Sequence, residues 1–101
     1  MFETISMPEF EQLIKKKSVS IIDVREAHEY EQGHIADVLF IPMQSIPEKL
    51  DTLDYDENYY VVCHSGVRSN AVCQYLAQEG YHVTNVMGGM SAWKGESVYG
   101  M

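Results

Sequence analysis

The stretch from Cys63 to Ser69 holds the residue types that a sulfur nucleophile needs. Cys63 follows an apolar run typical of a buried strand, and Gly66 permits an unusual backbone path before the next helix. Amide groups that curl around the start of a helix attract anions, and the same field lowers the pKa of a thiol. Arg68 adds a cation that can hold a multi-oxygen anion. The spacing Cys-x4-Arg therefore predicts a thiolate nucleophile inside an anion cradle.

Each residue of this stretch also has a simpler interpretation. A lone cysteine at a strand end is usually a small buried hydrophobe, but the neighbouring glycine and arginine favour the nucleophile for Cys63. His64 could tune the field or shuttle a proton, or could be a tolerated rim residue. Ser65 and Ser69 could donate hydroxyl hydrogen bonds to a bound sulfur, although Ser69 could equally cap the helix.

A second polar group, Asp23 and Arg25, ends an earlier apolar run. We favour a structural role for both residues, because Arg25 can reach Glu29 four residues later and Asp23 can accept loop amides.

The remaining cysteine and histidines predict no further chemistry. A helical rise of ~1.5 Å per residue separates Cys73 from Cys63 by more than the roughly 7 Å that a disulfide allows. Cys73 is therefore expected to be an inert thiol. His34 is expected to be a packing residue, and no spacing of zinc ligands is present, so no metal or other cofactor is predicted.

Short β-branched or aromatic runs alternate with helical patterns along the chain. The runs predict strands at 4–5, 19–24, 38–41, 59–62 and 83–86. The helical patterns include a start at Ser6 with Glu9 as a capping box, and the spans 25–32, 43–58 (a short helix, then a solvated acidic loop), 67–79 and a final short helix around Trp93. On 67–79 the expected apolar positions are 67, 71, 72, 75 and 76. This order predicts an α/β fold with a central, mainly parallel sheet of about five strands and helices on both faces, with a site beyond the carboxyl ends of the strands.

Composition limits the class of partner. The 101 residues suit a single domain over 1–101. A formal net charge of −8 argues against nucleic acid and anionic membranes, which bind surplus Lys and Arg, but a small anion responds to the local field of a pocket. Without an apolar span, a basic signal region or a set of cysteines for disulfides, we expect a cytoplasmic protein.

In their order and spacing these motifs resemble the rhodanese (thiosulfate sulfurtransferase) family, specifically its single-domain bacterial members. Cys63–Ser69 is similar to the active-site loop of that family. The other matching segments are Asp23-Val24-Arg25, Glu29-Tyr30, Gly33-His34-Ile35, Ile41-Pro42 and Gly88-Gly89 with Trp93. The segment Ala36-Asp37-Val38 departs from the Pro-Gly-Ala turn of many members.

The resemblance implies a rhodanese-like three-layer fold and a cysteine that carries sulfur as a persulfide. On this chain, the Cys63 thiolate would attack the outer sulfur of thiosulfate, sulfite would leave, and cyanide or a thiol would accept the sulfur. The residues expected to bind the anionic substrate are His64, Ser65, Gly66, Val67, Arg68 and Ser69, with Arg68 on the sulfonate oxygens and Asp23 and Arg25 in support. A monomer that passes sulfur to small acceptors, or to a sulfur-accepting protein, is expected.

Two other functions stay open at this point. The domain could be a persulfide carrier or binding module that serves a partner protein and turns over free thiosulfate poorly. It could also be a small phosphatase or arsenate reductase, although those relatives of the fold use Cys-x5-Arg. The shorter Cys-x4-Arg loop from Cys63 to Arg68 suits a single sulfur atom better than a tetrahedral oxyanion.

Overall fold

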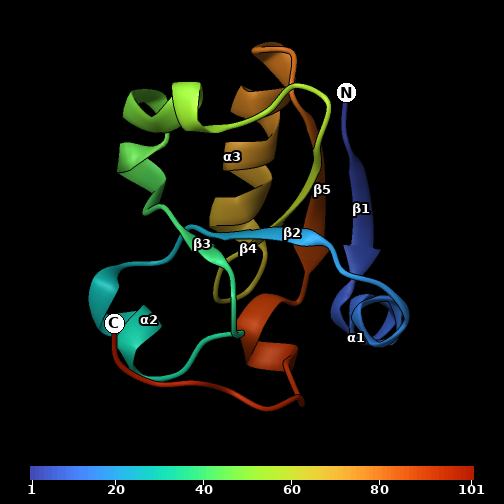
Figure 1. The fold of residues 1–101 in the computed structure, drawn as a ribbon, viewed down its shortest axis with the longest axis vertical. Coiled ribbons are helices and arrows are strands. Elements are labelled where there is room, and N and C mark those ends of the chain that lie inside the picture. The colour runs from blue at the N-terminus through green and yellow to red at the C-terminus, as the bar shows by residue number, and fades with distance from the viewer.

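A five-stranded sheet forms the centre of the computed structural model, which describes residues 1–101 (Figure 1). The strands lie in the order β1-β5-β4-β2-β3, and every neighbouring pair is parallel. Their bounds are β1 Glu3–Ser6, β2 Ser20–Asp23, β3 Leu39–Phe40, β4 Asn58–Val62 and β5 His82–Met87. The α/β class and the five-stranded parallel sheet are therefore confirmed.

Three α-helices and two 3₁₀ turns connect the strands, and a third 3₁₀ turn follows the last strand. Their bounds are α1 Met7–Lys16, α2 Ala27–Glu31, α3 Val67–Gln78, η1 Met43–Ser45, η2 Pro47–Thr52 and η3 Gly89–Ala92. The capping box at the start of α1 is confirmed, because the Ser6 hydroxyl accepts the Glu9 amide and the Glu9 carboxylate accepts the Ser6 amide, both at 3.3 Å.

Two of the shorter helices differ from the expectation. The short helix expected at the start of 43–58 is two 3₁₀ turns instead, since Pro47 lacks the amide that a continuous helix needs. The short helix expected around Trp93 is a 3₁₀ turn that ends at Ala92, and Trp93 is extended and packs against the apolar side chains beneath α1.

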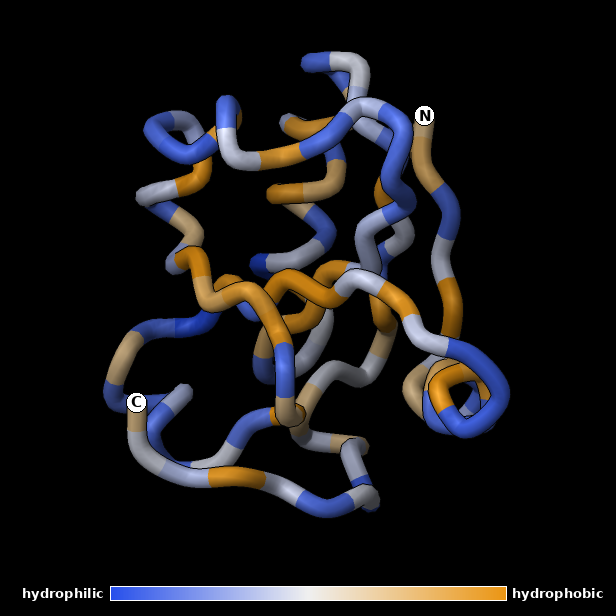
Figure 2. The backbone as a smooth tube through the Cα atoms, in the orientation of Figure 1, coloured by the Kyte–Doolittle hydropathy of each residue, from blue (hydrophilic) through white to orange (hydrophobic).

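The central strands bury side chains on both faces of the sheet, as parallel strands do. From β4, Tyr59 and Val61 join Cys63 in the core beneath α3, whereas Val62 joins the core beneath α1. Figure 2 shows hydrophobic residues along these central strands. Since β4 is the middle strand of the five, the residue that follows it lies at the centre of the carboxyl edge of the sheet.

The buried face of α3 differs from the expected one. Its buried side chains are Ser69, Val72, Cys73 and Leu76, whereas Val67 is 74% exposed and Ala71 is also exposed. The helix starts at the site, so its first turn directs a polar side chain toward Cys63 instead of an apolar one. The expected end of the helix is confirmed, because Gly80 has a φ of +94° and the Tyr81 amide donates to the Leu76 carbonyl at 3.0 Å.

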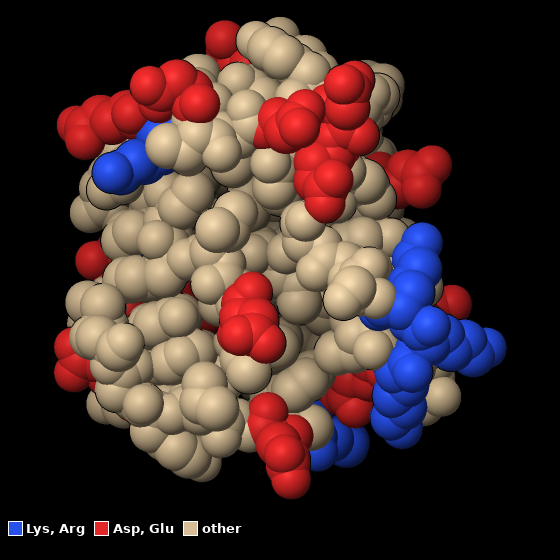
Figure 3. All heavy atoms as spheres, viewed as in Figure 1, with Lys and Arg blue, Asp and Glu red and all other residues tan.

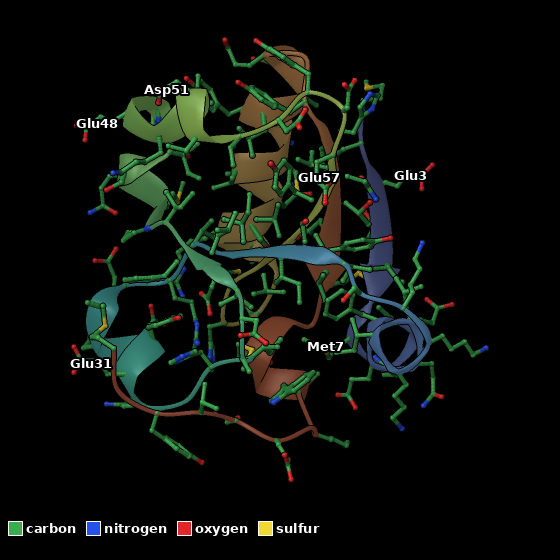
Figure 4. All side chains as sticks on the ribbon, in the orientation of Figure 1. Glu3, Met7, Glu31, Glu48, Asp51 and Glu57 are labelled. Atoms are coloured by element: carbon green, nitrogen blue, oxygen red, sulfur yellow. The ribbon has the colours of Figure 1, made fainter.

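The surface charge is predominantly acidic. In Figure 3 most visible Lys and Arg atoms gather around α1, whose last turn carries Lys15 and Lys16, while acidic side chains are scattered over the rest of this face. Glu48 and Asp51 point away from the fold in Figure 4 and are exposed, in keeping with a solvated acidic segment. No helix is both long enough and apolar enough to cross a membrane.

Candidate active site

Cys63 lies at the carboxyl end of the central strand β4, just before α3, and its side chain is fully buried. Its Sγ accepts the Gly66 amide at 3.0 Å and the Ser69 amide at 3.3 Å. Burial raises the pKa of the Cys63 thiol, but hydrogen bonds from the Ser69 hydroxyl and from loop amides outweigh burial. The pKa of Cys63 is therefore below its ordinary value.

The loop that supplies these amides is held from outside by the segment that begins with Gly88. The amides of Gly88, Met90 and Ser91 donate to the carbonyls of Ser65, Cys63 and His64 at 3.2, 2.8 and 2.8 Å, respectively. With its carbonyls occupied on the outside, the loop can turn amides toward the sulfur.

Gly89 makes the close approach of the two segments possible. A Cβ at this position would lie 2.3 Å from the Cys63 carbonyl oxygen and 2.7 Å from that of His64. Gly66 meets a different requirement, since its φ of +108° lies in the region that favours glycine. The Gly88-Gly89 motif, which follows β5, thus supports the loop through its carbonyls.

Arg68 is paired with a carboxylate from α2. Its two terminal nitrogens donate to the two Glu29 oxygens at 2.7 and 2.8 Å, and both side chains are partly exposed. The hydrogen bond from Arg68 lowers the pKa of Glu29 to about 2, and the Glu29 carboxylate raises the pKa of Arg68. The loop arginine is therefore anchored beside the cradle, and an arriving anion would compete with Glu29 for it.

Asp23 and Arg25 form a buried ion pair at the end of β2. The Arg25 guanidinium donates to both Asp23 oxygens, with the shortest contact at 2.9 Å, and to the Gly33 carbonyl at 2.9 Å. The expected acceptance of a loop amide by Asp23 is confirmed by the Arg25 amide at 3.1 Å. Arg25 does reach Glu29, but at its carbonyl, 3.3 Å away, and not at its carboxylate, since the buried guanidinium pairs with the adjacent buried carboxylate of Asp23.

Ser69 does not cap α3, because the N-cap position belongs to Gly66 and Ser69 sits within the first turn. Its Oγ lies 3.3 Å from the Cys63 Sγ and 2.5 Å from the Asn85 Oδ1. Asn85, on β5, also donates from Nδ2 to the Gly66 carbonyl at 3.3 Å. Sequence reasoning missed Asn85, although an amide side chain within an apolar strand pattern is a usable signal.

The remaining candidate residues lie around this centre. His64, Ser65 and Val67 are exposed, and His64 borders a hollow of about 560 Å³ whose lining includes His28, Glu29 and Trp93. The predicted packing role of His34 fits its ring, which stacks on Tyr30 and contacts the Tyr30 carbonyl.

Cys73 is placed as an inert thiol would be. It is fully buried among core side chains, and burial raises the pKa of its thiol to about 12. Both cysteines are free, and no three metal-ligating side chains lie together where they could hold a metal ion.

The comparison with known proteins identifies the family. Residues 6–96 match the family model described as a rhodanese-like domain. The chain belongs to the rhodanese family. This rhodanese domain therefore belongs to a family of sulfurtransferases, as its motifs indicated.

Relatives of this rhodanese domain cover most of its length. It is 45% identical over 87 residues to a Bacillus subtilis protein named "Putative sulfurtransferase YtwF", covering 86% of this chain and 84% of that protein. It is 35% identical over 95 residues to the thiosulfate sulfurtransferase GlpE of Coxiella burnetii, covering 93% and 89%, respectively. The crystal structure of a rhodanese-like domain protein from Staphylococcus aureus matches with a TM-score of 0.91 and 38% identity, over 99% of this chain and all of that one.

The segment that departs from many rhodanese domains keeps a turn of unusual backbone geometry. Asp37 has a φ of +65°, and it is the only residue other than glycine with a positive φ. Aspartate is among the few L residues that adopt this conformation at modest cost. The turn therefore forms without the glycine that many family members have there.

Proposed function

We propose that this rhodanese domain transfers sulfane sulfur from thiosulfate, or from a similar donor, through a persulfide on Cys63. The observation that carries the proposal is the pair of amide hydrogen bonds from Gly66 and Ser69 to the buried Cys63 Sγ. A thiolate can exist in that buried position because directed N–H groups stabilise it. The membership of a sulfurtransferase family and the similarity to a thiosulfate sulfurtransferase support the same chemistry.

In the first half-reaction, the Cys63 thiolate attacks the outer sulfur of thiosulfate. A bond forms between Sγ and that sulfur while the sulfur–sulfur bond of the donor breaks, and sulfite leaves with the electron pair. One negative charge remains on the outer sulfur of the Cys63 persulfide, and two leave with sulfite, so charge balances. The amides of the loop stabilise the charge at the outer sulfur.

Arg68 binds the sulfonate oxygens of the donor in this proposal. Its guanidinium is held beside the loop by Glu29, so the donor exchanges one anionic partner of Arg68 for another. The loop amides and the Arg68 guanidinium attract the donor. The buried Asp23–Arg25 pair positions α2, and with it Glu29.

In the second half-reaction, an acceptor attacks the outer sulfur of the persulfide. With cyanide, a carbon–sulfur bond forms, the persulfide bond breaks, and thiocyanate leaves while the Cys63 thiolate is restored. With a thiolate acceptor, the product is a persulfide of that acceptor. The hollow beside His64 gives room for the body of a thiol acceptor.

Steady-state kinetics with thiosulfate and cyanide test this proposal. We expect thiocyanate formation that is abolished in Cys63→Ala and retained in Cys73→Ala, since only the first thiol accepts loop amides. A saturable rate with thiosulfate supports an enzyme that acts on the free donor. Loading of Cys63 with a rate that does not saturate at high thiosulfate supports a carrier that serves a protein partner.

A further inference from the structure

The Ser69 hydroxyl lies between Asn85, which accepts its proton, and Cys63, which donates to it as a thiol and becomes a competing acceptor as a thiolate. Its Oγ is 3.3 Å from the Cys63 Sγ and 2.5 Å from the Asn85 Oδ1. A hydroxyl has one proton and can donate to only one of these atoms at a time.

Asn85 is held in the orientation in which its Oδ1 accepts the Ser69 hydroxyl proton. Its Nδ2 donates to the Gly66 carbonyl at 3.3 Å, and a carbonyl can only accept. The amide oxygen of Asn85 therefore faces Ser69, where it accepts the hydroxyl proton. Asn85 is 5% exposed and Ser69 is fully buried, which disfavours a solvent substitute for either bond.

The direction of the Ser69 proton depends on the state of Cys63. When Cys63 is a thiol, its S–H donates to the Ser69 Oγ and the Ser69 O–H donates to Asn85, so all groups are paired. When Cys63 is a thiolate, an Oγ lone pair facing the sulfur is repulsive. The hydroxyl must then turn toward Sγ and give up its bond to Asn85.

We propose that Asn85 is a positioning residue that controls the Ser69 hydroxyl and thereby limits how strongly Ser69 stabilises the Cys63 thiolate. This inference rests on the proposed role of Cys63 as the sulfur carrier. Once the persulfide forms, the negative charge moves to the outer sulfur. The Ser69 O–H then again donates its hydrogen bond to the Asn85 Oδ1. The hydroxyl rotates in each half-reaction, and its proton stays on Oγ throughout.

Two substitutions of Asn85 with opposite effects test the proposal. The readout is the rate of Cys63 alkylation by iodoacetamide against pH, which reports the thiol pKa without any sulfur donor. Asn85→Leu removes the competing acceptor, so we expect the pKa to fall by about half a unit to one unit, as one hydrogen bond corresponds to. Asn85→Asp keeps an acceptor and adds a negative charge, so we expect the pKa to rise by about one unit or more.

Removal of Ser69 separates an indirect effect from a direct one. Ser69→Ala should raise the pKa of Cys63. The double variant Ser69→Ala/Asn85→Leu should have the same Cys63 pKa as Ser69→Ala alone, because Asn85 then has no hydroxyl to direct. The control is Thr84→Val, the preceding buried position of β5, whose side chain faces the other side of the sheet and should leave the pKa unchanged. Arg68, which is paired with Glu29, and Cys73 also interact electrostatically with the Cys63 thiolate, and both are retained in every variant, so only Asn85→Asp adds a charge near the sulfur.

The pKa of Cys63 in Asn85→Leu decides the proposal. The proposal is overturned if this pKa rises or stays unchanged in a folded Asn85→Leu. It is also overturned if the pKa falls by the same amount when Ser69 is absent. If Asn85→Leu does not fold, the Asn85→Asp and Ser69→Ala variants decide, and an unchanged pKa in either overturns it. Incubation of the wild type with thiosulfate, followed by mass measurement, tests the proposed function separately, since alkylation requires no persulfide.

Discussion

Glu29 and Arg68 meet through two parallel hydrogen bonds of 2.7 and 2.8 Å, so the loop arginine is neutralised before any anion arrives. The two residues are 39 positions apart in sequence and come from α2 and α3. The pair gives the site a fixed cation together with a built-in competitor for it.

Removal of that competitor should strengthen donor binding. Glu29→Gln leaves the Arg68 guanidinium without its carboxylate, so we expect the KM for thiosulfate to fall about 3- to 10-fold, which corresponds to about 1 kcal/mol. Glu31→Gln is the matched control, since it removes the same charge from the exposed end of α2 and should leave KM unchanged. A KM that rises in Glu29→Gln would mean that the main effect of Glu29 is to orient Arg68 for the donor.

The same pair makes the domain more stable above the ordinary carboxyl pKa. The pKa of Glu29 is lowered from 4.5 to about 2, so its stabilisation is complete above about pH 4.5 and is lost as pH falls through 2. We expect wild type to exceed Glu29→Gln in free energy of unfolding by about 1–2 kcal/mol at pH 6. Urea denaturation at pH 6 and pH 2.5 should show this difference shrinking, whereas a difference that is constant with pH would contradict the assignment.

A methyl group at Gly89 should disrupt the loop. A Cβ there would meet the carbonyl oxygens of Cys63 and His64, which are backbone atoms that cannot move without moving the cradle. We expect Gly89→Ala to destabilise the fold by about 2–3 kcal/mol and to slow Cys63 alkylation. Gly100→Ala is the control, because Gly100 also has a positive φ (+79°) but no atom near its Cβ position, so it should show only the smaller backbone cost of about 1 kcal/mol. Equal losses in both variants would show that φ, not the contact with the loop, accounts for the effect.

The turn at Asp37 offers a stabilising substitution. Asp37 is exposed and has a φ of +65°, a conformation that glycine adopts without the Cβ penalty. Asp37→Gly should therefore raise the free energy of unfolding by about 0.5–1 kcal/mol, with no change in sulfur transfer. A thermal melt measures the first effect, and a lower melting temperature would mean that the Asp37 side chain makes a local contact worth more than the strain.

The sequence was sufficient for the strands and helices of the fold, because β-branched apolar runs, helical periodicity and capping signals depend on neighbours a few residues apart. The same patterns also predicted that Cys63 follows a central strand. Since parallel strands have their carboxyl ends at one edge of the sheet, this placed Cys63 at the expected site. The partner of Arg68 was not predictable from spacing: Glu29 lies four residues after Arg25, and local reasoning paired those two. Burial decided otherwise, because Arg25 took the adjacent buried carboxylate of Asp23.

Asn85 shows a second limit of sequence reasoning. Its importance comes from β5 lying beside β4, which places the amide against Ser69 and Gly66, 16 and 19 residues earlier in the chain. Similarly, the glycines at 88 and 89 matched a family motif, but their contact with the loop carbonyls depends on where η3 packs. Pairings of this kind are set by tertiary contacts that no local pattern encodes.

The mass of the intact protein after incubation with thiosulfate shows whether Cys63 carries a persulfide. We expect a gain of one sulfur atom that a thiol reverses, that is present in Cys73→Ala and that is absent in Cys63→Ala. No gain in the wild type with thiosulfate or any other sulfane donor, or a gain that persists without Cys63, would contradict a persulfide on Cys63.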